Sequence, residues 1–163
     1  MRDISDAVGI LPGSLYVHIR SKEEVLLRIV ERGIQNYLNS IETAVGAEAP
    51  AGERLRAAII AHMRVLSAPP QTRVAFHQWT YLGPENQKRV VKLRRRYEEL
   101  FSGIITDGIE NKEFREVRNV RVSVLALIGM LNSATEWYSP VGGLTADEVG
   151  DLIADNALTG LHS

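Results

Sequence analysis

The sequence predicts an all-α protein, and three observations lead to that prediction. Apolar residues recur at three- and four-residue steps from one end of the 163-residue chain to the other. Helix-start signals precede several of these runs, and no stretch keeps the alternation of a half-buried strand. The composition agrees, because 45% hydrophobic and 24% charged residues are close to the globular average. We therefore expect a bundle of helices.

The first long helix is predicted to start at a capping box, Ser21-Lys22-Glu23-Glu24, where the Ser21 hydroxyl can accept from the Glu24 amide. An apolar stripe follows at helical spacing: Leu26, Val30, Ile34, Leu38 and Ile41. Residues 46–52 are predicted to form a loop because they are rich in glycine, alanine and proline. A second helix is marked by Leu55, Ile59, Met63 and Leu66. It must stop at Pro69-Pro70, since proline removes a helix hydrogen bond.

A third helix is predicted to begin at Gly83-Pro84, because proline suits the first helical position. Its inward face comprises Val90, Leu93, Tyr97, Leu100, Ile104 and Gly108. Residues 111–114 interrupt the pattern, and a fourth helix is expected from about Glu116 to Tyr138. After a turn at 140–143, the capping box Thr145-Ala146-Asp147-Glu148 opens the last helix.

The fourth helix has an unusual surface, because its segment Val122–Leu131 is apolar nearly all round. Such a helix must be covered on two sides. We expect its own core to cover one side and a second copy of the chain to cover the other. The dimer would then form through helices at about 117–138 and 145–160. The alternative is that this helix lies at the centre of a monomeric bundle.

The first twenty residues carry a different pattern, of two short helices around a tight turn. Asp3–Val8 is predicted to be a helix that Gly9 ends, and Pro12 suits the start of a second helix over 13–19. This is the organisation of a helix-turn-helix, whose second helix reads DNA. The candidate DNA-binding residues are Ser14, Tyr16, Val17, His18 and Lys22. For each of them the alternative is an ordinary packed or solvated side chain.

One continuous run carries a recognisable motif: Ala7-x-Gly9-Ile10-x-x-Gly13-Ser14-Leu15-Tyr16-x-His18-Ile19-x-Ser21-Lys22-Glu23-Glu24-Val25. This run resembles, without a gap, the helix-turn-helix signature of the TetR family of transcriptional repressors. The resemblance implies a partial helix-turn-helix DNA-binding domain over residues 1–22 and a helical ligand-binding and dimerisation domain over 23–163. It also implies a repressor that binds operator DNA as a homodimer and is released by a small apolar effector. Residues 136–145 are similar to a subgroup that senses CoA thioesters, which implies an acyl-CoA or related thioester as effector.

The resemblance is incomplete at the start of the chain. Family members have a further helix before the point where this sequence begins, and that helix usually carries basic residues. Within residues 1–22 only three basic residues face two acidic ones, whereas DNA affinity depends heavily on phosphate neutralisation. We therefore expect weak or absent operator binding by this short form. The alternative function is a helical ligand-binding or interaction protein with a truncated, non-functional DNA-binding head.

An effector pocket is expected between the bundle helices, lined by apolar groups and a few convergent polar ones. The candidate ligand-binding residues are His62, His77, Trp79, Tyr97, Asn132 and Trp137. Asn132 is the most informative, because a polar residue on an apolar helix needs a partner. Each of the six can also be read as an ordinary core residue. The basic run over 88–96 is read as a solvated helix face rather than a phosphate site.

Several classes of protein are excluded by what the sequence lacks. The absence of cysteine excludes disulfides, thiol nucleophiles and cysteine-ligated metals. No histidine has a glutamate three residues before it, and there is no phosphate loop or nucleophile elbow. No apolar run approaches the ~20 residues that a membrane span needs. We therefore expect a cytoplasmic protein without membrane contact, which is not an enzyme and holds no cofactor or metal.

Overall fold

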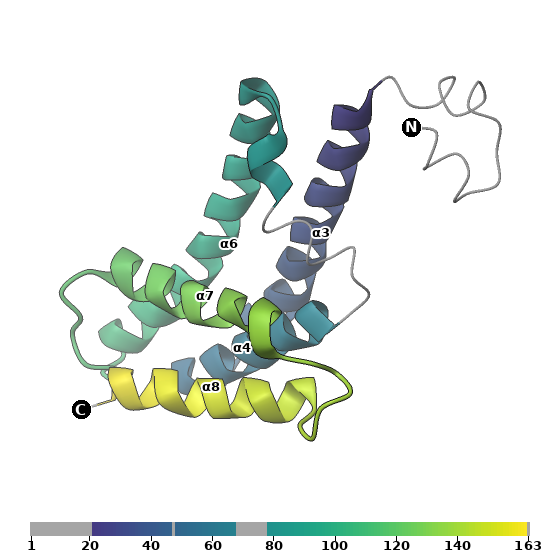
Figure 1. The fold of residues 1–163 in the computed structure, drawn as a ribbon. Coiled ribbons are helices and arrows are strands. Elements are labelled where there is room, and N and C mark those ends of the chain that lie inside the picture. Colours follow the sequence, from purple (N-terminus) through teal and green to yellow (C-terminus); the bar gives the residue numbers. More distant parts are fainter. Residues whose placement is uncertain (1–20, 47, 68–77, 163) are drawn as a thin grey trace.

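The computed structural model describes residues 21–46, 48–67 and 78–162. All regular structure in these residues is helical, which confirms the predicted all-α fold. The elements are α3 (Lys22–Val45), α4 (Ala51–Ser67), the 3-10 helix η1 (Gln78–Tyr81), α6 (Pro84–Glu110), α7 (Val120–Trp137) and α8 (Ala146–Leu161). The long helices α3 and α6 pack together, α7 crosses them, and α8 lies against α4 at the other end of the molecule (Figure 1).

Helix α3 begins as its capping residue predicts. The Ser21 hydroxyl accepts a hydrogen bond from the Glu24 amide at 3.1 Å. Val30, Ile34, Leu38 and Ile41 of the predicted stripe are buried. Leu26 is only partly buried, and Leu27 is the first buried residue of the helix. Tyr37 also turns inward, one position before Leu38, because 3.6 residues per turn widens the buried face beyond a single row.

Helix α4 starts inside the segment that was predicted to be a loop. It begins at Ala51, where the Arg54 amide donates to the Pro50 carbonyl at 3.0 Å and closes the first turn. The helix ends at Ser67, before the two prolines. The loop prediction was therefore too long by two residues, because a short run of alanine and glycine tolerates the helical conformation when tertiary packing supports it.

Helix α7 starts later than predicted, at Val120 rather than about Glu116. The Asn119 side chain caps it by accepting from the Val122 amide at 3.1 Å. The preceding residues instead return to the body of the protein. Phe114 packs on Gly108, and the Arg115 amide donates to the Leu161 carbonyl at 2.8 Å, which ties this loop to the end of α8.

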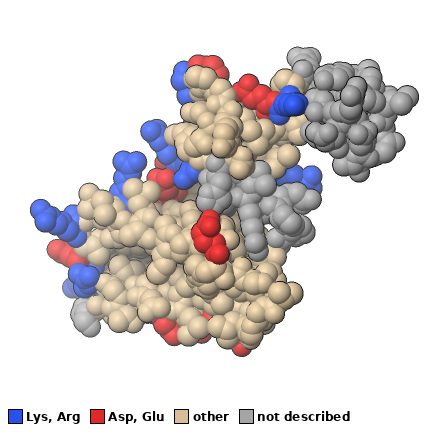
Figure 2. All heavy atoms as spheres, in the orientation of Figure 1, with Lys and Arg blue, Asp and Glu red and all other residues tan. Residues whose placement is uncertain are grey.

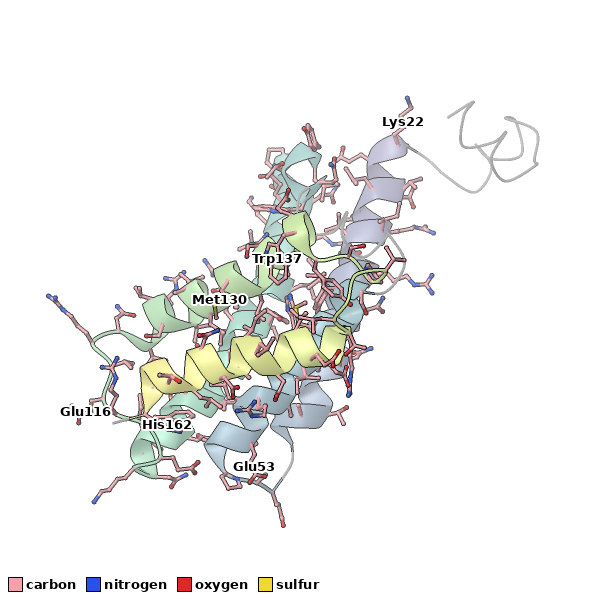
Figure 3. All side chains as sticks on the ribbon, turned by 60° about the horizontal axis from the view of Figure 1, so that its bottom comes forward. Lys22, Glu53, Glu116, Met130, Trp137 and His162 are labelled. Carbon is pink, nitrogen blue, oxygen red and sulfur yellow. The ribbon has the colours of Figure 1, made fainter. Side chains whose placement is uncertain are left out.

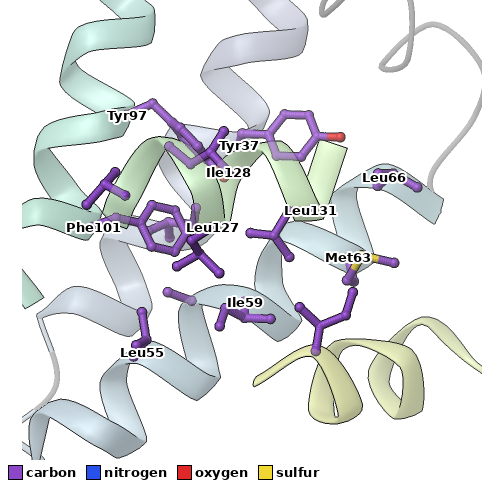
Figure 4. Packing of buried hydrophobic residues seen from close by; sticks show 14 of the residues in the cluster. Tyr37, Leu55, Ile59, Met63, Leu66, Tyr97, Phe101, Leu127, Ile128 and Leu131 are labelled. Carbon is purple, nitrogen blue, oxygen red and sulfur yellow. The ribbon is translucent and has the colours of Figure 1, made fainter. Parts of the chain in front are cut away.

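A single core joins the helices, with large side chains from α3, α4, α6 and α7 facing one another (Figure 4). Helix α8 adds to it by a close approach to α4, since a Cβ at Gly150 would lie 2.9 Å from the Cα of Ile60. Ion pairs border this contact. Arg64 binds Asp147, and Arg56 binds Asp155 at 2.6 Å. Helices α3, α4, α6 and α7 are thus held together by a common core.

Candidate functional site

A small cavity lies where α3, α6 and α7 meet. Its volume is about 20 Å³, which is about the room that one water molecule needs. The residues that line it are Ile34 and Tyr37 from α3, Arg94, Tyr97 and Glu98 from α6, and Ile128 and Asn132 from α7. The helical spacing of these residues on each element explains why they point to one place.

Buried aromatic and imidazole rings form the floor of this cavity. His62, on α4, is fully buried, and its Nδ1 is hydrogen bonded to the Tyr97 hydroxyl at 2.5 Å. Its ring centre lies 4.7 Å from that of Tyr37, and Tyr97 contacts Phe101 at 5.4 Å. Burial lowers the pKa of His62 to about 3 and raises the pKa of Tyr97 well above its ordinary value. Both groups are therefore neutral near pH 7.

Two polar groups at the cavity have unused binding capacity. The Oδ1 atom of Asn132 is buried and accepts no hydrogen bond from any residue that the structure describes. Arg94 is half-buried, and its guanidinium stacks over the Trp79 ring at 5.0 Å. Burial lowers the pKa of Arg94, an effect that the negative charge of Glu98 opposes. A buried acceptor and a poorly solvated cation are suited to a ligand with a polar, electron-rich group beside an apolar body.

The structure brings three of the six predicted ligand residues together: His62, Tyr97 and Asn132. Trp79 does not line the cavity, but Arg94, which does, stacks over its ring. Trp137 is apart, 57% exposed on the outer side of α7 (Figure 3). His77 lies outside the described residues. All six assignments remain predictions.

Sequence reasoning missed three cavity residues, Tyr37, Arg94 and Glu98. The basic run of α6 was read as a solvated face, and this is correct for Lys88, Arg89, Lys92, Arg95 and Arg96 but wrong for Arg94. The signal was available, because Arg94 lies three residues before Tyr97 and one turn after Val90 on the buried side.

Of the five DNA-binding candidates, the structure describes Lys22, at the start of α3. Lys22 is the first residue of that helix and is exposed at its tip (Figure 3). Ser14, Tyr16, Val17 and His18 lie outside the described residues. A lysine at the start of a helix, beside unpaired amides, can bind a DNA phosphate.

Helices α7 and α8 present an apolar outer face. Its large side chains are between 43% and 61% exposed: Val122, Leu125 and Trp137 on α7, Leu144 in the loop that follows, and Leu152 on α8. On the face that Figure 2 shows, charged side chains are few over the lower half of the molecule and lie mostly near its edges. A groove of about 290 Å³ runs between the helices beside Met130 and Ala157. Contiguous exposed apolar surface of this kind marks an interaction site.

The part of the chain that the structure describes offers neither a metal site nor a membrane span. No group of three or more histidine or carboxylate side chains there could hold a metal ion. None of the described helices is both long and apolar enough to cross a membrane.

A family model for the tetracyclin repressor-like C-terminal domain matches residues 48–161. The chain belongs to the TetR family of transcriptional regulators, a family of DNA-binding repressors rather than enzymes. The transcriptional repressor KstR2 of Rhodococcus jostii is 28% identical over 166 residues, which cover 100% of this chain and 81% of the relative. The fatty acid metabolism regulator protein of Bacillus subtilis is 22% identical and is covered over 84% of its length by 98% of this chain.

Solved structures agree with this assignment. PfmR, a TetR-family regulator of Thermus thermophilus, is 32% identical with a TM-score of 0.90, over 99% of this chain and 88% of that chain. AibR in complex with isovaleryl coenzyme A and operator DNA is 22% identical, with a TM-score of 0.82 over 98% of this chain and 84% of that chain. At that identity AibR supports the fold alone.

Proposed function

We propose that this protein is a ligand-responsive transcriptional repressor that binds operator DNA as a homodimer and releases it when a small effector binds. The proposal divides the chain into a DNA-binding segment, residues 1–22, and a helical ligand-binding and dimerisation domain, residues 23–163. Ser14, Tyr16, Val17, His18 and Lys22 are its proposed DNA contacts. Because operator DNA is the partner, the proposed location is the cytoplasm.

The observation that carries the proposal is the cavity between α3, α6 and α7, with its unused polar groups. The buried Asn132 oxygen accepts no hydrogen bond from the described residues, and Arg94 makes no ion pair with them. The unpaired Asn132 oxygen costs the ligand-free core free energy, and Arg94 keeps its hydrogen-bond donors available while it stacks over Trp79. An effector that enters here would meet apolar walls, one cation and one acceptor.

We propose a CoA thioester of a small apolar acid as this effector. Its acyl part would lie against Ile34 and Ile128, its carbonyl oxygen would accept from Arg94, and a donor on the ligand would reach Asn132. The likeness of residues 136–145 to CoA-thioester sensors supports this class. So does the fold shared with AibR, which was solved with isovaleryl coenzyme A. His62, His77, Trp79, Tyr97 and Trp137 complete the proposed binding set.

The test combines ligand and DNA measurements on the full chain. A thermal-shift panel of acyl-CoAs, with free CoA and the free acids alongside, identifies the thioesters that bind. A thioester at ~100 times its Kd stabilises the protein by about 2.7 kcal/mol. Arg94→Met must weaken that shift, whereas Lys92→Met, on the exposed side of the same helix, must leave it unchanged. If no thioester raises Tm more than free CoA does, the proposed effector is wrong.

Selection of DNA from a random pool then tests the repressor function. We expect weak binding, because residues 1–22 carry only three basic residues against two acidic ones. The selected DNA should still show one preferred, two-fold symmetric sequence with half-sites one helical turn apart, and the same thioester should release it. Thioester binding without any DNA preference would instead support the alternative function, a ligand-binding bundle whose head does not read DNA.

We further propose that the dimer forms through α7 and α8. What supports it is the apolar outer face of these helices, which no described residue covers. Leu152→Lys places a charge on this face and should give a monomer in sedimentation velocity runs. Tyr81→Lys is the matched control, because Tyr81 is also exposed and apolar but lies on η1. A Leu152→Lys dimer as stable as wild type would refute this interface.

A further inference from the structure

Glu23 connects the first turns of two helices that are distant in the sequence. Its Oε1 atom accepts from the Gly83 amide at 2.8 Å and from the Asn86 side chain at 2.7 Å. The start of α3 is thus bound to the start of α6. The capping motif explains Ser21, and Glu24 pairs with Arg28. Neither role accounts for Glu23.

Helix α6 receives its cap from this contact. Its own N-cap residue, Gly83, has no side chain with which to cap the helix. The Glu23 carboxylate supplies the acceptor and places negative charge at the positive end of α6. Glycine suits the position, because a Cβ on residue 83 would lie 3.0 Å from the carboxylate oxygen. The two hydrogen bonds lower the pKa of Glu23, so the carboxylate stays ionised near pH 7.

Both helices run from this contact to the cavity. Helix α3 reaches it with Tyr37, and α6 reaches it with Arg94 and Tyr97. Between the two ends, Glu31 of α3 pairs with Arg89 of α6 at 2.8 Å. Lys22, which directly precedes Glu23 in the sequence, is the last residue of the proposed DNA-binding segment. The cavity and the Glu23 contact therefore lie on the same pair of helices, with the Glu31–Arg89 ion pair between them.

We propose that Glu23 is a positioning residue for DNA binding, which holds the first turn of α3, the helix that follows the proposed DNA-binding segment in the sequence, in a fixed orientation to α6. An occupant of the cavity that displaces α6 then turns the start of α3 by pulling on this carboxylate. The inference rests on the proposed function for its DNA side, and on the geometry alone for the link between the two helices.

Removal of the Glu23 carboxylate tests the proposal, because two explanations predict opposite changes in DNA affinity. Loss of an acidic group near DNA strengthens binding if electrostatics alone matters. Loss of a positioning contact weakens it. We expect Glu23→Ala to weaken binding to the selected operator about tenfold and Glu23→Gln, which keeps one acceptor, about threefold, as for the loss of charge-assisted hydrogen bonds. Equal or tighter binding by both variants would overturn the proposal.

A matched control removes a negative charge from the first turn of α6 and leaves the contact with α3 intact. Glu85 lies in the first turn of α6, is exposed, and pairs only with Lys88 in the structure. Glu85→Gln should bind operator as wild type does, or more tightly. If Glu85→Gln loses as much affinity as Glu23→Ala, charge at the end of α6 is responsible and the link to α3 is not. Far-UV melting curves of all variants show whether each is folded at the assay temperature.

A second measurement needs no DNA and separates this inference from the proposed function. Because the chain contains no cysteine, spin labels can be attached at Arg28→Cys and Lys88→Cys alone. Mixing the labelled protein with an excess of unlabelled protein leaves one labelled subunit in each dimer, so that the measured distance is the one between α3 and α6 within that subunit. In electron–electron resonance, Glu23→Ala should lengthen and broaden that distance, and Glu85→Gln should not. If wild type selects no DNA, the repressor function fails, and this distance alone decides the role of Glu23. Identical distances in wild type and Glu23→Ala would refute it.

Discussion

Acid should destabilise this protein through His62, because that side chain is buried in its neutral form. Its pKa is lowered from 6.5 to about 3 by burial. In the unfolded chain the imidazole takes up a proton near pH 6.5, while in the folded protein it stays neutral until about pH 3. The unfolded state therefore binds more protons across this interval, and the stabilising contribution, complete above pH 6.5, is lost as the pH falls. The free energy of unfolding should fall by about 1.4 kcal/mol per pH unit between the two pKa values. The total loss from His62 over that interval is about 5 kcal/mol.

Urea unfolding followed by far-UV circular dichroism between pH 4 and 7 measures this contribution. Wild type should lose about 3 kcal/mol more than His62→Gln between pH 6 and pH 4. At pH 7 the variant should already be less stable, because the Tyr97 hydroxyl loses its partner. His162→Gln is the control, since it removes an exposed histidine and leaves the buried one in place. Parallel curves for wild type and His62→Gln would show that His62 is not the buried titrating group.

Other substitutions test single contacts. Gly150→Ala should lower stability by about 1–3 kcal/mol, because its Cβ would lie 2.9 Å from the backbone of Ile60. Gly103→Ala is the helical control and should raise stability by up to about 1 kcal/mol, because its Cβ would meet nothing within 4 Å. A rise in Tm with Gly150→Ala would contradict the close packing of α4 and α8. Thr145→Ala should cost about 1 kcal/mol in urea unfolding, because the Glu148 amide loses its acceptor. Asn132→Leu should stabilise the ligand-free protein and weaken thioester binding in calorimetry, and a variant that binds as wild type does would exclude Asn132 from the site.

The helices were predictable because their ends are set by local chemistry. Ser21 and Thr145 accept from the first-turn amides of their helices, and Pro84 opens α6, so neighbouring residues alone place these starts. The start of α7 was predicted too early because its position depends on contacts with distant parts of the chain. Phe114 packs on Gly108 and the Arg115 amide bonds to the end of α8, so the helix begins only at Val120, after its cap Asn119.

The candidate site was predictable only in part. His62, Tyr97 and Asn132 could be found because polar groups on buried helix faces are uncommon. Arg94 could not be separated from its exposed basic neighbours by composition, since only its angular position on α6 distinguishes it. The contact of Glu23 with Gly83 joins residues 60 apart in the sequence, and no local rule connects such positions.

The small size of the cavity has a kinetic consequence. A space of about 20 Å³ cannot admit an acyl chain, so the helices around it must separate before anything larger than water can enter. The observed association rate should therefore level off at high concentration, at the frequency with which the helices open, rather than rise toward the diffusion limit.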